Sequence, residues 1–140
     1  NFKKKIHNKY CDNTLSSIYT LDVCFYTLTK DKAYKIVSIA GFIDYDFNIE
    51  ACYKKQNEIS NELRTLFTNA KRHVDSYAHG ADKTRNSKEK DIIFRLQSGD
   101  EAGIACIHWG KEFKKKRNMK SHMQVFIDTK DYAEFLKTAW

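Results

Sequence analysis

The chain has 140 residues, of which 41% are apolar and 14% aromatic, and it carries 25 Lys and Arg against 18 Asp and Glu. This length fits one domain of about 100–200 residues, and the apolar content excludes a disordered chain. No apolar run approaches the ~18–20 residues of a membrane-spanning helix, and the lack of proline excludes polyproline segments. We therefore expect one soluble basic domain over residues 1–140, with a formal net charge of +7.

The N-terminal segment and the cysteines both bear on the cellular compartment. Residues 1–14 are polar and basic and predict an N-terminal arm or an edge segment, and the chain begins at Asn1 rather than at Met, which indicates a processed product. Four cysteines without a Cys-x-x-Cys pair argue against a zinc ribbon or a thioredoxin-like site. These features favour a secreted or periplasmic protein, whereas the alternative is a cytoplasmic protein with four buried thiols. The candidate disulfide residues are Cys11, Cys24, Cys52 and Cys106.

Alternating apolar and polar residues predict two strands in the first third of the chain. Residues 15–28 alternate with a period of two, which is typical of a half-buried strand. Residues 29–32 form a polar break of hairpin length. Residues 33–43 carry apolar side chains on both faces, so we expect a central strand there.

The apolar spacing changes to three and four residues between Ile49 and Tyr77, which predicts one long amphipathic helix. Asp46 or Asn48 can cap its start, and a glycine near residue 80 can end it. An unbroken helix of about 30 residues would be about 45 Å long, so we expect a kink near residue 60. Its stripe should face the sheet and bury Leu63, Leu66 and Phe67.

The second half of the chain predicts three more strands and a final helix. The pattern predicts a loop over residues 80–90 and a hairpin formed by strands 92–97 and 102–109. It also predicts a fifth strand over 123–127 and a helix after Thr129. The expected fold is α+β, with a single antiparallel sheet of about five strands in the order β-β-α-β-β-β-α, packed against one long helix and a C-terminal helix. This architecture hosts many functions and does not name one.

Positive charge is concentrated in three segments, residues 1–10, 71–90 and 111–120. The last segment has six cations and one acid, and we expect a solvated loop there. Such clusters attract phosphates, anionic lipids or acidic proteins, although lysine-rich loops also simply keep proteins in solution. The candidate residues for binding an anion or a partner are Lys111, Lys114, Lys115, Lys116, Arg117 and Lys120.

Two histidines supply the main catalytic hypothesis. His108 and His122 flank the basic segment on neighbouring predicted strands, where they can act as general base and acid beside Lys111 in a metal-independent ribonuclease. Cys106 lies two residues before His108 and can be activated as a thiolate, but burial or a disulfide explains it better. The sequence contains no metal-ligand, nucleotide-binding or hydrolase motif, so we expect no metal and no cofactor and favour a protein that is not an enzyme.

The favoured interpretation is a small exported binding domain that recognises a protein partner or an anionic ligand through its basic loops. The alternative is a basic domain that acts on nucleic acid, such as a ribonuclease-type toxin module. A third interpretation is an accessory subunit whose tyrosine-rich face packs on a larger assembly. The first predicts oxidised cysteines, the second predicts salt-dependent RNA binding, and the third predicts an exposed apolar patch.

Overall fold

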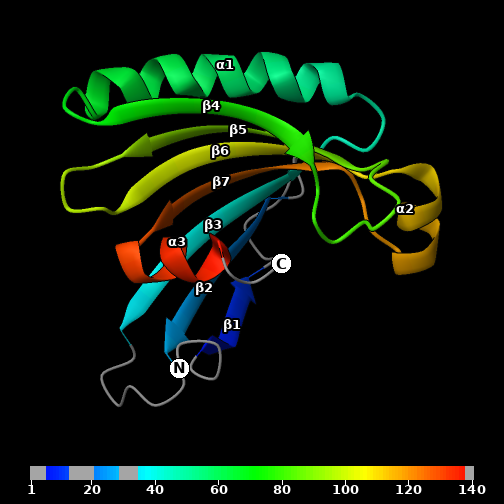
Figure 1. Cartoon of the computed structure of the whole chain (residues 1–140), viewed down its shortest axis with the longest axis horizontal. Helices are drawn as coiled ribbons and strands as arrows, with labels where there is room; N and C mark the ends of the chain where they lie inside the picture. Colours follow the sequence, from blue (N-terminus) through cyan, green and yellow to red (C-terminus); the bar gives the residue numbers. More distant parts are fainter. Residues whose placement is uncertain (1–5, 13–20, 29–34, 138–140) are drawn as a thin grey trace.

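The computed structural model describes residues 6–12, 21–28 and 35–137, and within them the chain forms one seven-stranded antiparallel sheet with three helices (Figure 1). The strands are β1 (Ile6–Asp12), β2 (Leu21–Leu28), β3 (Ile36–Asp44), β4 (Lys71–Ala78), β5 (Lys88–Arg95), β6 (Glu101–His108) and β7 (His122–Asp128). The helices are α1 (Ile49–Leu66), α2 (Lys111–Arg117) and α3 (Lys130–Lys137). The predicted α+β class and the single antiparallel sheet are confirmed.

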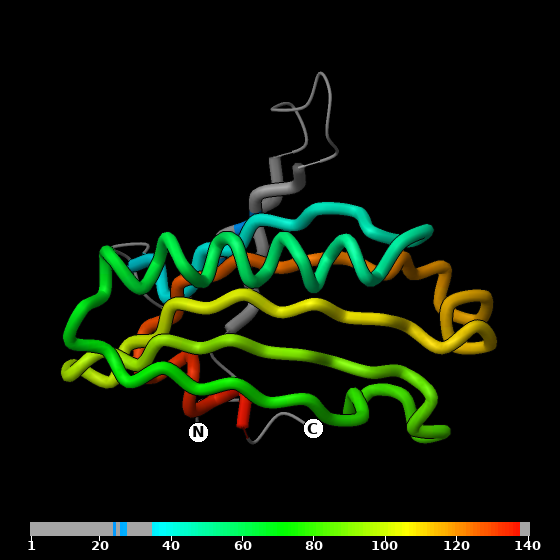
Figure 2. Tube along the Cα trace, turned by 90° about the horizontal axis from the view of Figure 1, so that it is seen from above, coloured from blue at the N-terminus to red at the C-terminus, as the bar shows by residue number. Residues whose placement is uncertain are grey.

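Two antiparallel meanders share the sheet, whose strand order is β1-β2-β3-β7-β6-β5-β4. β3 pairs with β7 in the middle, so the chain must cross from the centre of the sheet to its far edge to begin β4. Helix α1 makes this crossing and covers one face of the second meander (Figures 1 and 2). Asn48 caps its start by accepting a hydrogen bond from the Ala51 N–H, as the sequence predicts.

The main core lies between α1 and the sheet. Leu63 and Phe67 pack against it as predicted, and the Phe67 ring centroid lies 6.3 Å from that of Phe94. The prediction for Leu66 is wrong, since this residue is 71% exposed. Leu66 is exposed because α1 ends at this residue, and Phe67, which is no longer helical, makes the contact with the sheet. The buried residues of this core are Cys52, Ile92, Phe94, Ile104, Cys106 and Met123.

The predicted long helix is too long at its C-terminal end. α1 is continuous through residue 60, without the expected break, and ends at Leu66, where the Phe67 N–H donates to the Leu63 carbonyl. Residues 71–78 instead form β4, which pairs with β5 at the edge of the sheet. Seven of the eight β4 residues are exposed, so the strand lacks the alternation that marks a half-buried strand in a sequence.

Two further segments differ from the prediction. The N-terminal segment, predicted to be an arm or an edge segment, contributes the edge strand β1, and β1 and β4 together give the sheet seven strands rather than about five. Part of the basic segment 111–120, predicted to be a loop, is helix α2. Residues 15–20 and 33–34 of the first two predicted strands lie outside the described residues.

A disulfide between Cys52 and Cys106 ties α1 to β6, with Cα atoms 6.1 Å apart and both residues fully buried. The predicted disulfide involving a strand cysteine is therefore confirmed. On the other meander, Cys11 of β1 and Cys24 of β2 are partners in the strand register. The disulfide also leaves Cys106 without a thiolate, so this residue has no role as a nucleophile.

Candidate functional site

The loop between β4 and β5, residues 79–87, is organised around one buried carboxylate. Asp82 accepts hydrogen bonds of 2.7 to 3.0 Å from the backbone N–H and the hydroxyl of both Thr84 and Ser87. These bonds hold the pKa of Asp82 at about 2, well below its usual range. The loop therefore has a defined conformation although most of its residues are exposed.

The same loop is attached to the start of α2. The Ser87 hydroxyl oxygen accepts a 2.9 Å hydrogen bond from the Gly110 N–H. A Cβ at Gly110 would lie 3.0 Å from the Cβ of Asn86, so a glycine permits this close approach. The β4–β5 loop and α2 consequently sit together at one end of the sheet (Figure 1).

Helix α2 is anchored on its other side by tertiary contacts. The Phe113 ring stacks on Trp109 at 5.1 Å, and the Lys114 ammonium pairs with Asp46 at 2.5 Å in the turn between β3 and α1. The Lys114 ammonium holds the pKa of Asp46 below its usual range. Lys120, just beyond the helix, pairs with Asp44 at 2.8 Å. The acidic residues before α1 therefore serve to position α2.

The six predicted anion-binding residues separate into two groups. Lys114 and Lys120 are neutralised by the ion pairs with Asp46 and Asp44. The other four are exposed and make no ion pair within the part of the chain that the structure describes. They are Lys111, Lys115, Lys116 and Arg117.

The β4–β5 loop and the first residue of β5 add three exposed cations to this end, Lys83, Arg85 and Lys88, and no described acid forms an ion pair with them. We call the seven residues together the cationic end: Lys83, Arg85, Lys88, Lys111, Lys115, Lys116 and Arg117. The charge of segments 71–90 and 111–120 was visible in the sequence, but their meeting at one end of the sheet was not.

The two candidate catalytic histidines are on neighbouring strands but are not brought together. His122 pairs with Ile107 in the register of β6 and β7, so their side chains share one face of the sheet. His108 is the next residue along β6 and projects from the opposite face. His122 also donates from Nδ1 to the Lys120 carbonyl at 2.8 Å, and its ring lies 5.7 Å from Phe42.

A second group of titratable side chains lies on the sheet face opposite α1. The Tyr77 hydroxyl donates to Asp91 Oδ2 at 2.6 Å, and Glu89 lies two residues before Asp91 on the same face. Burial and the neighbouring Asp91 charge raise the pKa of Glu89 to about 8. His79 lies 3.5 Å from Glu89 through Nε2, and its ring is 4.4 Å from that of Trp109.

Sequence reasoning missed this group because it depends on the pairing of β4 with β5. Tyr77 and Glu89 face one another in that register, whereas the sequence placed Tyr77 on a helix. The Glu89-x-Asp91 spacing was the available signal, since two residues apart on a strand share a face. Burial raises the pKa of both carboxyl groups, so the pair holds a proton more tightly than an isolated carboxylate does.

Comparison of the chain with protein-family models, with curated protein sequences and with solved structures gives no match. No helix among the described residues is long and apolar enough to cross a membrane.

Proposed function

We propose that the protein is a binding domain that docks an acidic partner on its cationic end. One observation carries this proposal: seven exposed cations from two segments distant in the sequence lie at one end of the sheet, and none of them forms an ion pair with a described residue, although Glu112 lies among them on α2. Unpaired cations at such density raise the local potential, attract anions and accelerate association.

The framework beneath these charges supports the same conclusion. Asp82 fixes the β4–β5 loop, and the ion pair between Lys114 and Asp46 fixes α2. A backbone that is already ordered loses little conformational entropy when a partner binds. The charged side chains are consequently presented from a pre-organised surface.

The residue types favour an acidic protein surface over single-stranded nucleic acid. Five of the seven cations are lysines, which act as point charges rather than as planar forks for phosphate. The neighbouring aromatic residues offer no stacking platform for bases, because Trp109 is 3% exposed and the half-buried ring of Phe113 is stacked on Trp109. The Cys52–Cys106 disulfide supports a partner met in an oxidising compartment.

The ribonuclease alternative has less support. A general acid and a general base must both reach the same phosphodiester group. His108 and His122 project from opposite faces of the sheet, and His122 is packed beside Phe42. The positions of the two histidines therefore favour binding without cleavage.

The test measures binding of a fluorescent poly-glutamate peptide, with poly-uridine RNA as a second probe. The variant carries Lys115→Glu, Lys116→Glu and Arg117→Glu. A control with the same change in net charge reverses exposed cations elsewhere, namely Lys54, Lys71 and Lys137. We expect the α2 variant to lose at least about tenfold in affinity for poly-glutamate, the control to lose much less, and the affinity to fall as salt rises.

Four results would change the conclusion. Equal losses in the two variants would show that net charge rather than the cationic end attracts the peptide. Tighter binding of RNA through the same residues would favour the nucleic-acid alternative, and RNA cleavage that is lost in His108→Ala and His122→Ala would favour the ribonuclease. No binding of either probe at low salt would refute the proposal.

A further inference from the structure

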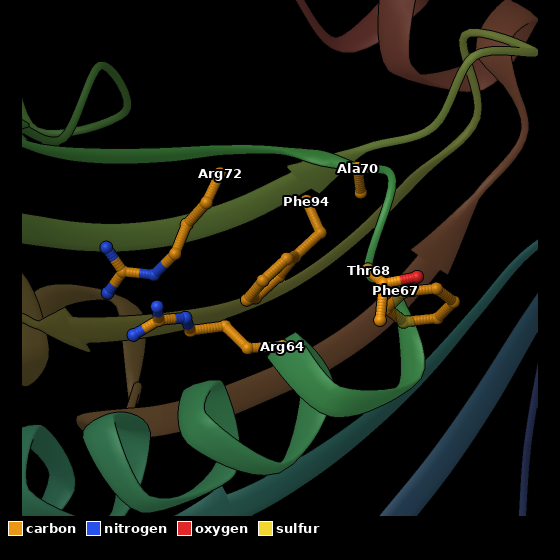
Figure 3. Close-up of a pocket in the computed structure, with 6 residues that line it drawn as sticks. All are labelled: Arg64, Phe67, Thr68, Ala70, Arg72 and Phe94. Atoms are coloured by element: carbon orange, nitrogen blue, oxygen red, sulfur yellow. The ribbon is translucent and has the colours of Figure 1, made fainter.

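A second candidate binding site lies at the other end of β4, away from the cationic end. It is a pocket of about 480 Å³, open to solvent on one side, between the last turn of α1 and the first residues of β4 (Figure 3). This volume falls in the range of about 300–1,000 Å³ that is typical of sites for small molecules. The lining residues are Arg64, Phe67, Thr68, Ala70, Arg72 and Phe94.

Two guanidinium groups share this pocket. Arg72 is the register partner of Phe94, so its side chain projects from the face that α1 covers. Its Nε donates a 3.1 Å hydrogen bond to the hydroxyl of Ser60, a buried residue of α1, and this bond fixes the direction of the side chain. Arg64 lies one turn after Ser60 on α1, and Figure 3 shows both guanidinium groups extending in the same direction beside the Phe94 ring.

The pocket supplies no negative charge to balance the two arginines. None of its lining residues is acidic, and neither Arg64 nor Arg72 forms an ion pair within the described residues. The Nη groups of Arg72 and the whole fork of Arg64 remain as donors, because the bond to Ser60 uses only the Nε of Arg72. Two unpaired forks in one pocket match the oxygens of a carboxylate or a phosphate group.

We propose that this pocket binds a small organic anion through Arg64 and Arg72. A bare oxyanion would fill only a small part of the volume, so the bound molecule carries a body in addition to its charged group. Thr68 adds a hydroxyl to the lining, and the half-buried ring of Phe67 and the methyl group of Ala70 supply its smaller apolar part, which suits a compact organic body. The ligand class is thus an organic carboxylate or phosphate monoester, and the proposal is independent of the cationic end.

The experiment is a two-dimensional NMR titration of the whole chain with benzoate, with phenyl phosphate and with inorganic phosphate. The backbone amide signals of Thr68, Ala70 and Arg72 report on the pocket. We expect saturable shifts with one or both organic anions at a dissociation constant of about 1 mM, a value usual for a small ligand in an open site. The tighter binding of either benzoate or phenyl phosphate shows whether the site prefers a carboxylate or a phosphate group. Inorganic phosphate should bind about tenfold more weakly than the tighter of these two anions.

Three variants separate specific binding from charge attraction. Arg64→Gln and Arg72→Gln should each weaken binding at least about tenfold. Lys71→Gln is the matched control, because Lys71 lies beside Arg72 on β4, projects from the opposite face and is exposed. It should change the affinity by less than about twofold.

Arg64→Gln keeps the proposal testable even if loss of the bond to Ser60 alters the fold of Arg72→Gln. Shifts that do not saturate by about 20 mM, or an equal loss in Lys71→Gln, would overturn the site. Inorganic phosphate binding as tightly as phenyl phosphate would overturn the requirement for an organic body.

Discussion

Removal of the Cys52–Cys106 disulfide should be one of the most destabilising changes available in this protein. The bridge joins residues 54 apart in the sequence and thus closes a long loop in the unfolded chain. In the chain-entropy model a loop of this length corresponds to a stabilisation of about 4 kcal/mol. Since small domains have only about 5–15 kcal/mol of unfolding free energy, the double variant Cys52→Ala, Cys106→Ala should lose a large fraction of its stability.

Urea unfolding of the oxidised wild type and of the double variant measures this loss. With a slope of about 1–3 kcal/mol per molar urea, a difference of about 4 kcal/mol moves the midpoint by more than about 1 M. Reduction of both proteins supplies the control, because Cys24 is also disulfide-bonded and the two proteins should unfold at similar urea concentrations only when every bridge is reduced in both. A loss of less than about 1 kcal/mol would refute the reasoning from loop length.

The same bond bears on the compartment of the protein. Alkylation of the unreduced protein, purified from its own compartment, followed by intact mass measurement counts its free thiols. We expect Cys52 and Cys106 to be protected. Reactive thiols at both positions would remove the support that the disulfide gives to an exported protein.

Two further predictions concern packing and pH. Leu63→Ala should lower the unfolding free energy by about 2 kcal/mol or more, because Leu63 packs on the core. Leu66→Ala should change it by less than about 0.5 kcal/mol, because Leu66 is exposed. Equal effects of the two substitutions in urea unfolding would contradict the packing of α1. Burial raises the pKa of Glu89 from 4.5 to about 8, so the folded state binds this proton more tightly and stability falls as pH rises through that range. Glu89→Gln should remove this fall, so the variant should melt at a higher temperature than the wild type at pH 8. The separate fall in stability caused by Asp128, whose pKa is about 6, should remain in both proteins below pH 6. If the difference between the two melting temperatures is the same from pH 5 to pH 8, Glu89 is already ionised at pH 5.

The errors of the sequence analysis share one physical cause. Residues 71–78 continue the helical spacing of the preceding segment, and their strand conformation comes from pairing with β5 rather than from an alternating pattern. Helix α2 has only seven residues, too few to form by themselves, and its position depends on the ring of Trp109 and the charge of Asp46. In both segments, contacts with residues distant in the sequence select the conformation.

In the candidate site too, the local composition was predictable from the sequence, whereas the contacts between distant residues were not. The excess of cations in residues 111–120 was evident from the sequence, and four of its six predicted residues are exposed and form no ion pair with any described residue. The neutralisation of Lys114 and Lys120 depends on the position of two acidic residues some 70 residues earlier in the chain. The hypothesis for His108 and His122 placed them on neighbouring strands, but the register separates them onto opposite faces.

The α+β class, most of the strands and the start of α1 can be predicted without the fold, because they follow from the spacing of apolar residues along a short stretch of chain. Three other features are seen only in the folded chain: residues 71–78 pair with β5, α2 meets the β4–β5 loop, and Arg64 and Arg72 share a pocket. Each of these features requires contact between segments far apart in the sequence. The free energy of such contacts depends on strand register and on the distance between charges, and neither quantity is encoded in local periodicity.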